Sequence, residues 1–396
     1  MEAKSRRRRG LTVTAVVAAV LVVTFYVGGG WYFSNQIHSD ALTPLPSTAD
    51  NGLYVIGLDA GTVTITSSEE RSDSKQPGTY GLAWDNGYGR IGEIVSVDGL
   101  EVTREFEIVD GSAPEVCTGP LEGCDQVDID GWTFESDPGD VGLDFTEVQY
   151  RSPLGAMGAW RIDAGDGSVW AIHAHGWRAA RREALRFLPV YSDAGITSLV
   201  IDYRNDPDEP ADPSGLYRFG RTEWEDVAGA IRYAIEEGGA NKIILVGYST
   251  GASAEMSFLE NSPDAGLVTA AVFDSPNIDM RGTVRAAAEK RTIPGTPLPI
   301  PGSLISVALA IADLRWDVDW GAVDYHDVVP DVLTMPTLVF HGTADSRVPI
   351  ESSRRLAEGS ASVELIEVAE ADHVRSWNVD PMLYQAELAE FLAANG

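Results

Sequence analysis

Three patterns of apolar and polar positions follow one another along the chain. The first is an apolar stretch over residues 11–33 that contains no charged residue. At about 1.5 Å per residue, a helix of this length can cross a hydrocarbon core roughly 30 Å thick. The pattern therefore predicts a transmembrane helix over residues 11–33, in preference to a helix buried in a protein core.

The second pattern favours β-strands. Val102, Phe106 and Ile108 alternate with polar residues, which is the period of a half-buried strand. An Asp-Gly pair at residues 98–99 precedes them and is typical of a hairpin turn. This stretch predicts a small β-rich region over residues 52–143, and we favour a role as a spacer or packing support over a role in binding.

From Val148 onward, apolar runs of strand length are separated by helical patterns. The strand-like runs are residues 148–150, 159–162, 169–175, 197–203, 242–246, 270–273, 337–340 and 363–368. Thr222 and Glu225 match a capping box at the start of a helical pattern over residues 224–235. Apolar strands that alternate with helices predict a mostly parallel sheet with helices on both faces. The first two or three strands, joined by tight turns such as residues 163–167, are expected to be antiparallel.

Residues 278–335 interrupt this alternation. Within them, four prolines between residues 294 and 301 precede an apolar run over residues 304–314. The run is shorter than a transmembrane helix and contains Asp313. We expect either a cap-like insertion that covers a site or a helix of the core, with neither favoured.

Composition and charge narrow the class of protein. The 396-residue chain is 44% hydrophobic, which is sufficient for a substantial core. It has 29 Lys and Arg residues against 60 Asp and Glu residues, a net charge of −31 at pH 7. This balance excludes broad binding to the phosphate backbone of a nucleic acid, which requires a basic surface.

Basic residues near the N-terminus orient the apolar helix. Lys4 and the arginines at residues 6–9 precede it, and Lys and Arg prefer the cytoplasmic side of a membrane. We therefore expect a cytoplasmic tail over residues 1–10 and a single-pass anchor in the cell membrane. The rest of the chain, beginning with a polar stalk over residues 34–51, is expected outside. A cleavable secretory signal is the alternative, but no convincing cleavage site follows the apolar stretch.

Two cysteines, Cys117 and Cys124, lie in the exported region of the chain. An oxidising compartment favours a short-loop disulfide between them. A metal site is a poor alternative because no histidine lies nearby, and the spacing is not that of a redox motif.

A candidate nucleophile follows one of the predicted strands. Residues 247–251 read Gly-Tyr-Ser-Thr-Gly, directly after the apolar run over residues 243–246 and before a segment that suits a helix. In this context, Gly247 and Gly251 relieve crowding at a sharp turn that lifts the hydroxyl of the central serine above the sheet. The motif predicts that Ser249 is a nucleophile, whereas the alternative is an ordinary turn serine.

A serine nucleophile needs a base to take its proton, and histidine is the usual one. Enzymes that use this turn place the histidine last in the order serine, acid, histidine. Of the six histidines, only His326, His341 and His373 follow Ser249. His373 is the expected base, because it alone lies in the loop after the last predicted strand.

The acid that orients the base is expected at the carboxyl end of a strand. Asp345 follows the predicted strand over residues 337–340, at the edge where such sheets place their ligands. Asp274 and Asp372 are the rivals, but Asp372 is adjacent to His373 and so poorly directed. We favour Asp345.

Acyl transfer also needs donors for the oxyanion. The backbone N–H of Thr250, next to the nucleophile, is one candidate. The N–H of Trp177, after the strand over residues 169–175, is the other. His173 and His175 as a metal pair is the alternative use of this segment, but no third ligand has suitable spacing, so no metal site is expected.

Together these segments resemble an α/β-hydrolase from about residue 144 to the C-terminus. The matching elements are His175-Gly176-Trp177, Asp202-Tyr203-Arg204, residues 247–251, residues 341–349 and Asp372-His373, in the order of the family. The resemblance implies an eight-stranded, mostly parallel sheet, a triad of Ser249, Asp345 and His373, and no cofactor. The combination is similar to exported or membrane-tethered esterases and peptidase-like hydrolases of high-GC bacteria.

Three functions follow for a catalytic domain over residues 144–396. The leading one is hydrolysis of a small carboxylic ester through an acyl-enzyme on Ser249. A peptidase or amidase with the same triad is the near alternative. The third is a tethered scaffold without catalytic activity, against which the complete triad argues.

Overall fold

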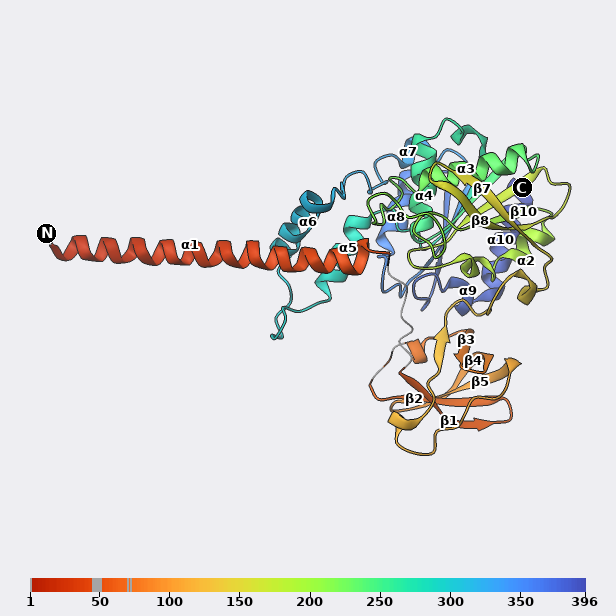
Figure 1. Cartoon of the computed structure of the whole chain (residues 1–396), viewed down its shortest axis with the longest axis horizontal. Helices are drawn as coiled ribbons and strands as arrows, with labels where there is room; N and C mark the ends of the chain where they lie inside the picture. The colour runs from red at the N-terminus through yellow and green to blue at the C-terminus, as the bar shows by residue number, and fades with distance from the viewer. Residues whose placement is uncertain (1, 45–51, 70, 72) are drawn as a thin grey trace.

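The computed structural model describes residues 2–44, 52–69, 71 and 73–396. One long helix projects from a body that contains two β-sheets, a smaller one of six strands and a larger one of eight (Figure 1). The long helix is α1 (Glu2–Ile37), which continues into a π-helical turn, η1 (His38–Leu42). Between residues 12 and 42 it is long and apolar enough to span a membrane, and its most apolar 18-residue window has a mean hydropathy of 2.1.

The end of this helix differs from the expected polar stalk. Within the described residues 34–44, the chain is mostly helical and lies against the body rather than extending away from it. Leu42 is buried, and its carbonyl accepts a hydrogen bond of 2.8 Å from the N–H of Tyr217. Apolar Phe33 and Ile37 pack into the same cluster, so burial of apolar side chains holds this segment in place. Residues 45–51 of the expected stalk lie outside the described residues.

The six-stranded sheet is antiparallel throughout, with strand order β1-β2-β5-β4-β3-β6. Its strands are β1 (Leu53–Asp59), β2 (Thr62–Ser67), β3 (Tyr80–Trp84), β4 (Gly87–Asp98), β5 (Glu101–Gly111) and β6 (Asp128–Asp130). The predicted hairpin turn joins β4 to β5, and Gly99 has a φ of 62° there. Cys117 and Cys124 form the expected disulfide after β5.

Arg104 departs from the polar and apolar alternation of β5 for a structural reason. Its side chain is fully buried, yet its guanidinium donates hydrogen bonds to the backbone carbonyls of Gly92, Gln76 and Gly78. A buried charge is tolerated when it is fully hydrogen-bonded. Arg104 therefore joins β4 to the segment that precedes β3.

The eight-stranded sheet has the order β14-β13-β12-β11-β9-β10-β8-β7. Its strands are β7 (Thr146–Ser152), β8 (Gly155–Ile162), β9 (Val169–Ala174), β10 (Thr197–Ile201), β11 (Lys242–Tyr248), β12 (Val268–Asp274), β13 (Thr337–Gly342) and β14 (Val363–Val368). All eight predicted strands are present. β8 runs antiparallel to its neighbours β7 and β10, and the remaining pairs are parallel. β8 and β9, which the turn at residues 163–167 joins, are not neighbours because β10 lies between them.

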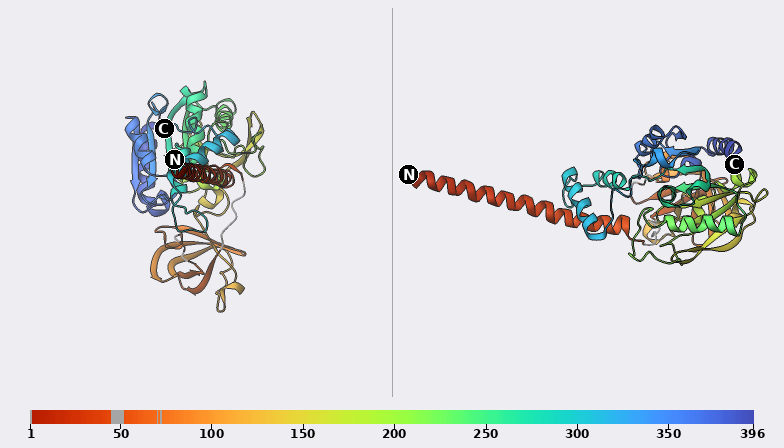
Figure 2. Two further views of the ribbon diagram at one scale, coloured as in Figure 1. Left: turned by 90° about the vertical axis from the view of Figure 1, so that its left-hand side faces the viewer. Right: turned by 90° about the horizontal axis from the view of Figure 1, so that it is seen from above.

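Helices cover both faces of this sheet, as expected (Figure 2). One face carries α3 (Trp224–Glu236), α4 (Thr250–Asn261) and α8 (Glu351–Gly359), and the other carries α2 (Leu188–Asp193), α9 (Ser376–Val379) and α10 (Pro381–Asn395). Shorter 3₁₀ turns are η2 (Asp73–Lys75), η3 (Leu121–Gly123), η4 (Pro138–Val141), η5 (Arg181–Ala184) and η6 (Ala265–Leu267).

The predicted capping box at the start of α3 does not form. The hydroxyl of Thr222 donates instead to Asp212 at 2.8 Å, and Glu225 accepts from the guanidinium of Arg204 at 2.9 Å. Arg204 is buried and also bonds to Asp226. Because a buried guanidinium without acceptors costs more than one cap hydrogen bond, its pairing takes precedence over the cap.

Residues 278–335, which we call the cap, contain α5 (Met280–Glu289), α6 (Gly302–Trp316) and α7 (Val329–Val332). α6 lies beside the second half of α1 (Figure 1). The guanidinium of Arg315 stacks 3.9 Å above the ring of Trp31 and donates to the side chain of Ser34 at 2.8 Å. α6 is therefore neither a second membrane span nor part of the sheet core, but a partner of α1.

The two sheets are joined by buried hydrogen bonds at α9. The side-chain amide of Asn378 donates to the carbonyls of Thr79 and Gly131, and its oxygen accepts from Arg186. Both Asn378 and Arg186 are almost fully buried. These bonds fix the β-rich region against the larger body.

Removing this joint is expected to destabilise the protein. Asn378→Ala removes the buried hydrogen bonds of this side chain to Thr79, Gly131 and Arg186, so we expect the free energy of unfolding to fall by about 2–4 kcal/mol. Urea unfolding of the detergent-solubilised protein measures this. Asn241→Ala, at an exposed position, is the control and should change it by less than about 0.5 kcal/mol. Equal effects of the two substitutions would contradict the assigned role of Asn378.

Candidate active site

Ser249 lies at the sharp turn between β11 and α4. Its backbone has φ 51° and ψ −114°, a strained conformation for a residue with a side chain. Its N–H donates to the carbonyl of Asp274, and its carbonyl accepts from the N–H of Asn277, both at 3.0 Å. A Cβ on Gly251 would lie 2.0 Å from the carbonyl oxygen of Ala174. The turn therefore requires glycine at this position.

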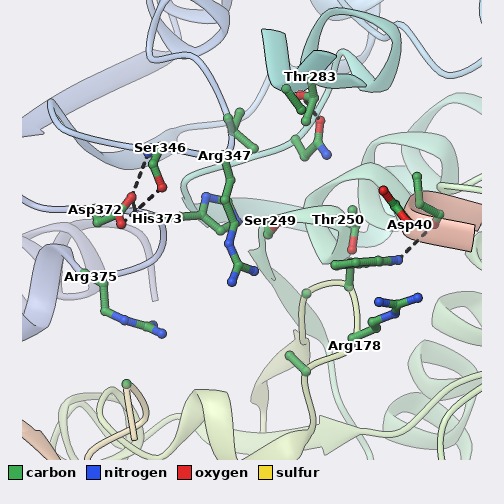
Figure 3. Close-up of a pocket in the computed structure, with 18 of the residues that line it drawn as sticks. Asp40, Arg178, Ser249, Thr250, Thr283, Ser346, Arg347, Asp372, His373 and Arg375 are labelled. Atoms are coloured by element: carbon green, nitrogen blue, oxygen red, sulfur yellow. Dashed lines mark hydrogen bonds between the residues drawn. The ribbon is translucent and has the colours of Figure 1, made fainter. Parts of the chain in front are cut away.

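The imidazole of His373 lies beside the Ser249 hydroxyl (Figure 3). Its Nε2 is 2.8 Å from Ser249 Oγ, and its Nδ1 is 2.8 Å from Oδ2 of Asp345. These distances fit a neutral imidazole that accepts the hydroxyl proton at Nε2 and donates its Nδ1–H to the carboxylate. The next residue, Val374, has φ 51°, and its N–H donates to Ser275, which fixes the loop that carries His373.

Asp345 is held as a buried carboxylate after β13. Its Oδ1 accepts the backbone N–H groups of Arg347 and Val348 at 2.8 Å each, and its Oδ2 also lies 3.1 Å from His341 Nε2. Burial by itself raises the pKa of Asp345, but the charge of His373 and hydrogen bonds from both histidines outweigh it and hold the pKa below its usual value. The carboxylate therefore stays ionised.

The rival residues have other partners. Asp372 accepts the N–H of Ser346 and the side-chain amide of Gln76. Asp274 is buried beneath the turn, and burial raises its pKa to about 6. The ring of His326 bonds to Asp324 within the cap. Among the histidines that follow Ser249, His373 is the one that the structure places beside the hydroxyl.

Two backbone amides face the space beside Ser249. Thr250 and Trp177 both line the cavity above the hydroxyl. Within the described residues of the chain, neither N–H has a hydrogen-bond acceptor. By contrast, the N–H of Gly176, the residue before Trp177, donates to the buried carboxylate of Glu183 at 2.7 Å. Amides without an acceptor are suited to bind an oxyanion.

Comparison with protein-family models matches residues 171–391 to the description "Alpha/beta hydrolase family". The chain belongs to the alpha/beta hydrolase family. A second model, described as a domain of unknown function (DUF8805), matches residues 54–119, within the β-rich region. No curated protein matches the chain.

Solved structures support the fold of this hydrolase. The esterase Pf2001 of Pyrococcus furiosus matches in two crystal forms, with TM-scores of 0.52 and 0.51 and 19% sequence identity. The match covers 66% of this chain and 95% or 96% of the esterase. The esterase RhEst1 from Rhodococcus sp. has a TM-score of 0.44 and 18% identity, over 63% of this chain and 99% of its own. At 19% identity, the likeness to Pf2001 shows the fold alone.

His173 lies in β9 and His175 directly follows this strand. Their contacts do not indicate a shared metal site. His173 is buried between Tyr248 and Ser198, and burial lowers its pKa to about 3. His175 bonds through Nε2 to Asp206 at 2.8 Å. His175, Asp206 and Asp202 have ligand atoms close together, but Asp202 is already paired with an arginine of η5 at 2.8 Å. The hydrolase thus uses these side chains as a buried ion-pair cluster.

Hydrogen bonds attach the loop that carries Trp177 to the end of α1 and the turn after it. No pattern in the sequence predicts this contact. The indole N–H of Trp177 donates to the carbonyl of Ala41 at 3.0 Å. The guanidinium of Arg178 lies 4.1 Å above the Trp177 ring and donates to the carbonyls of Ser39 and Thr43. The end of the predicted membrane anchor therefore positions one wall of the active site.

A cavity of about 1360 Å³ opens above Ser249 and His373. Its lining comes from four regions of the chain: the end of α1, the β-rich region, the cap and the loops of the eight-stranded sheet. Figure 3 shows Arg347 and Arg375 on the side of His373, and Arg178 and Asp40 on the side of Thr250. The β-rich region thus contributes to this hydrolase's cavity.

The His175–Asp206 pair predicts a pH-dependent stability. Burial lowers the pKa of His175, but the charge and hydrogen bond of Asp206 raise it to about 9, from an ordinary value of 6.5. Since the folded pKa lies above the unfolded one, the stabilisation is complete below about pH 6.5 and is lost as the pH rises through 9. The midpoint of thermal unfolding should therefore fall over this range.

Asp206→Asn should remove this decline, because the amide cannot stabilise the imidazolium by charge. Asp193→Asn, at an exposed position on α2, is the control and should keep it. Melting temperatures of the three proteins from pH 6 to about pH 9.5 make the comparison. A decline of equal size in Asp206→Asn would show that another group causes it.

Proposed function

We propose that this hydrolase cleaves carboxylic esters through an acyl-enzyme on Ser249. The observation that carries the proposal is the continuous contact from Ser249 Oγ to His373 and from His373 to Asp345, each at 2.8 Å. Ser249 Oγ attacks the ester carbonyl carbon while His373 Nε2 takes its proton. The ionised Asp345 stabilises the imidazolium that forms.

The attack places a negative charge on the former carbonyl oxygen. The backbone N–H groups of Trp177 and Thr250 are the proposed donors to this oxyanion, since both face the cavity without another acceptor among the described residues. One such donor contributes about 3 kcal/mol to the stability of the transition state. Collapse of the intermediate breaks the bond to the alkoxy group, which leaves as an alcohol with the proton from His373.

Water then completes the reaction. His373 takes a proton from a water molecule, whose oxygen attacks the acyl carbon, and the acid is released as Ser249 recovers its proton. The same steps can cleave an amide, because the triad does not select the leaving group. Rates on a series of aryl esters and matched aryl amides test the choice, and turnover of amides alone would contradict the ester proposal.

We also propose that α1 crosses the cell membrane with residues 1–10 in the cytoplasm and the hydrolase outside. The apolar length of α1 and the basic residues before it support this orientation. The disulfide between Cys117 and Cys124 fits an oxidising exterior.

The triad is tested by substitution and by an active-site probe. Ser249→Ala should abolish labelling by a fluorophosphonate and lower kcat by about 10⁴-fold or more, because no nucleophile remains. Asp345→Asn should lower kcat by about 10³- to 10⁴-fold, because the amide no longer stabilises the imidazolium. Ser168→Ala, in a surface turn, is the matched control and should behave as the wild type. Failure of the folded wild type to react with the probe would refute the nucleophile and support a scaffold without catalysis.

The orientation is tested with single cysteines, since both native cysteines form the disulfide. Met382→Cys places a thiol on α10, where the native side chain is 83% exposed, and Ser5→Cys places one in the basic tail. A membrane-impermeant maleimide should label the first in intact cells and the second only after lysis. The opposite pattern would reverse the proposed topology.

A further inference from the structure

One side of the cavity above Ser249 is apolar and is built jointly by α1 and the cap. Phe33 and Ile37 of α1 face it together with Met280 and Val284 of α5, Ile300, and Ile305 of α6. An ion pair also joins the ends of α1 and α5, since Arg291, just after α5, pairs with Asp40 of η1 at 2.8 Å. The predicted membrane anchor thus contributes to the cavity wall.

The cap lies beside the segment of α1 that is apolar enough to span a membrane. The hydroxyl of Tyr26 hydrogen-bonds to that of Ser303 at 2.8 Å, so the first turn of α6 lies beside the second half of α1. A Cβ on Gly30 would lie only 2.7 Å from the side chain of Val307, which shows how close the helices are. At its other end, the charged Arg315 lies level with Trp31, a residue type typical of the membrane interface.

The cap includes an uncharged segment and exposes two leucine side chains. Residues 292–312 contain no charged residue, in a chain of net charge −31. Leu298, in the proline-rich loop before α6, is 59% exposed, and Leu314 is 87% exposed. Exposed large apolar side chains are a feature of surfaces that contact lipid or protein. Because the segment lies against α1, the proposed membrane span, the bilayer is the partner that we assign to it.

The side of the cavity formed by the β-rich region is the more polar one, although apolar side chains also line it. It is lined by Gln76, Tyr88 and Asp130 of the β-rich region and by Arg375 beside the loop of His373. Ser249 lies between the apolar and polar sides, so a molecule bound with its ester at Ser249 directs an apolar group toward α1 and a polar group toward the β-rich region. This division matches an amphiphile rather than a small soluble ester.

We propose that the substrate is an acyl ester resident in the membrane. Its acyl chain lies against α1, α5 and α6, its ester reaches Ser249, and its polar group faces the β-rich region. The proposal rests on the proposed ester hydrolysis and adds the substrate class. Products separate accordingly, since the fatty acid remains on the apolar side and the alcohol on the polar side.

The depth of the cap is tested without any substrate. Leu298→Cys and Met382→Cys, each labelled with a fluorophore, are reconstituted at full length into phosphatidylcholine vesicles. Spin-labelled lipids should quench the probe at Leu298→Cys and leave the probe at Met382→Cys bright, and aqueous iodide should do the reverse. Quenching of both probes by iodide alone would overturn the placement of the cap in the bilayer.

The substrate class is tested by narrowing the apolar side. Ala287 is an exposed residue of α5 that lines the cavity, whereas its neighbour Ala286 does not. Ala287→Trp should lower kcat/KM for a long-chain acyl ester in vesicles by about tenfold or more and leave a soluble acetyl ester within about threefold. Ala286→Trp should leave both substrates at the wild-type rate. An equal loss of both substrates in Ala287→Trp would contradict an acyl site at this wall.

The two proposals can fail separately. Suppose that the wild-type protein reacts with fluorophosphonate and turns over soluble acetyl ester, but not long-chain ester in vesicles. This result supports ester hydrolysis and contradicts the membrane substrate. If the wild-type protein reacts with neither the probe nor any ester, the proposed hydrolysis itself is contradicted. The result expected is reaction with the probe and a higher kcat/KM for the ester in vesicles than for the soluble one.

Discussion

The rest of the site depends on the crowded turn at Ser249. The positive φ of this residue directs its hydroxyl away from the sheet and toward the loops that follow β13 and β14. Close contact is what holds the turn, because β9 leaves no room for a side chain at Gly251. The flanking N–H and carbonyl of Ser249 are bonded to Asp274 at the end of β12 and to Asn277 after it, so the strain is sustained by three neighbouring strands. A hydroxyl fixed in this way needs little reorganisation to act as the proposed nucleophile.

The second constraint is the attachment of the end of α1 to the loop that carries Trp177. A membrane anchor joined to its enzyme by a free stalk would leave the active site independent of the bilayer. Here, the indole N–H of Trp177 and the guanidinium of Arg178 both donate to carbonyls in the segment that follows α1. The orientation of α1 and the position of the proposed oxyanion donor are therefore coupled, and the same helix also forms part of the apolar wall of the cavity.

The sequence allowed the prediction of features that depend on local pattern. The eight strands, the hairpin turn and the placement of Ser249, Asp345 and His373 at the ends of β11, β13 and β14 follow from periodicity and chain order. Features that depend on distant partners could not be predicted in this way. The side chain of Thr222 does not cap α3, because the acidic groups there pair with the buried Arg204. Residues 34–44 pack on the body because their apolar side chains contact those of residues 278–335. Neither partner is adjacent in the sequence.

The β-rich region packs against the larger body, which is one of the two roles expected for it, and its contacts extend to the loop of His373. A spacer needs no contact with the catalytic loops, yet the amide of Gln76 donates to Asp372, the residue before His373. Asn378, in the short helix α9 that follows this loop, donates to the carbonyls of Thr79 before β3 and Gly131 after β6. The region thus supports the loop of the proposed base from outside the eight-stranded sheet and supplies the polar wall of the cavity. In the proposed membrane orientation, the polar end of the proposed substrate would face this region, because α1 and the cap make the apolar wall.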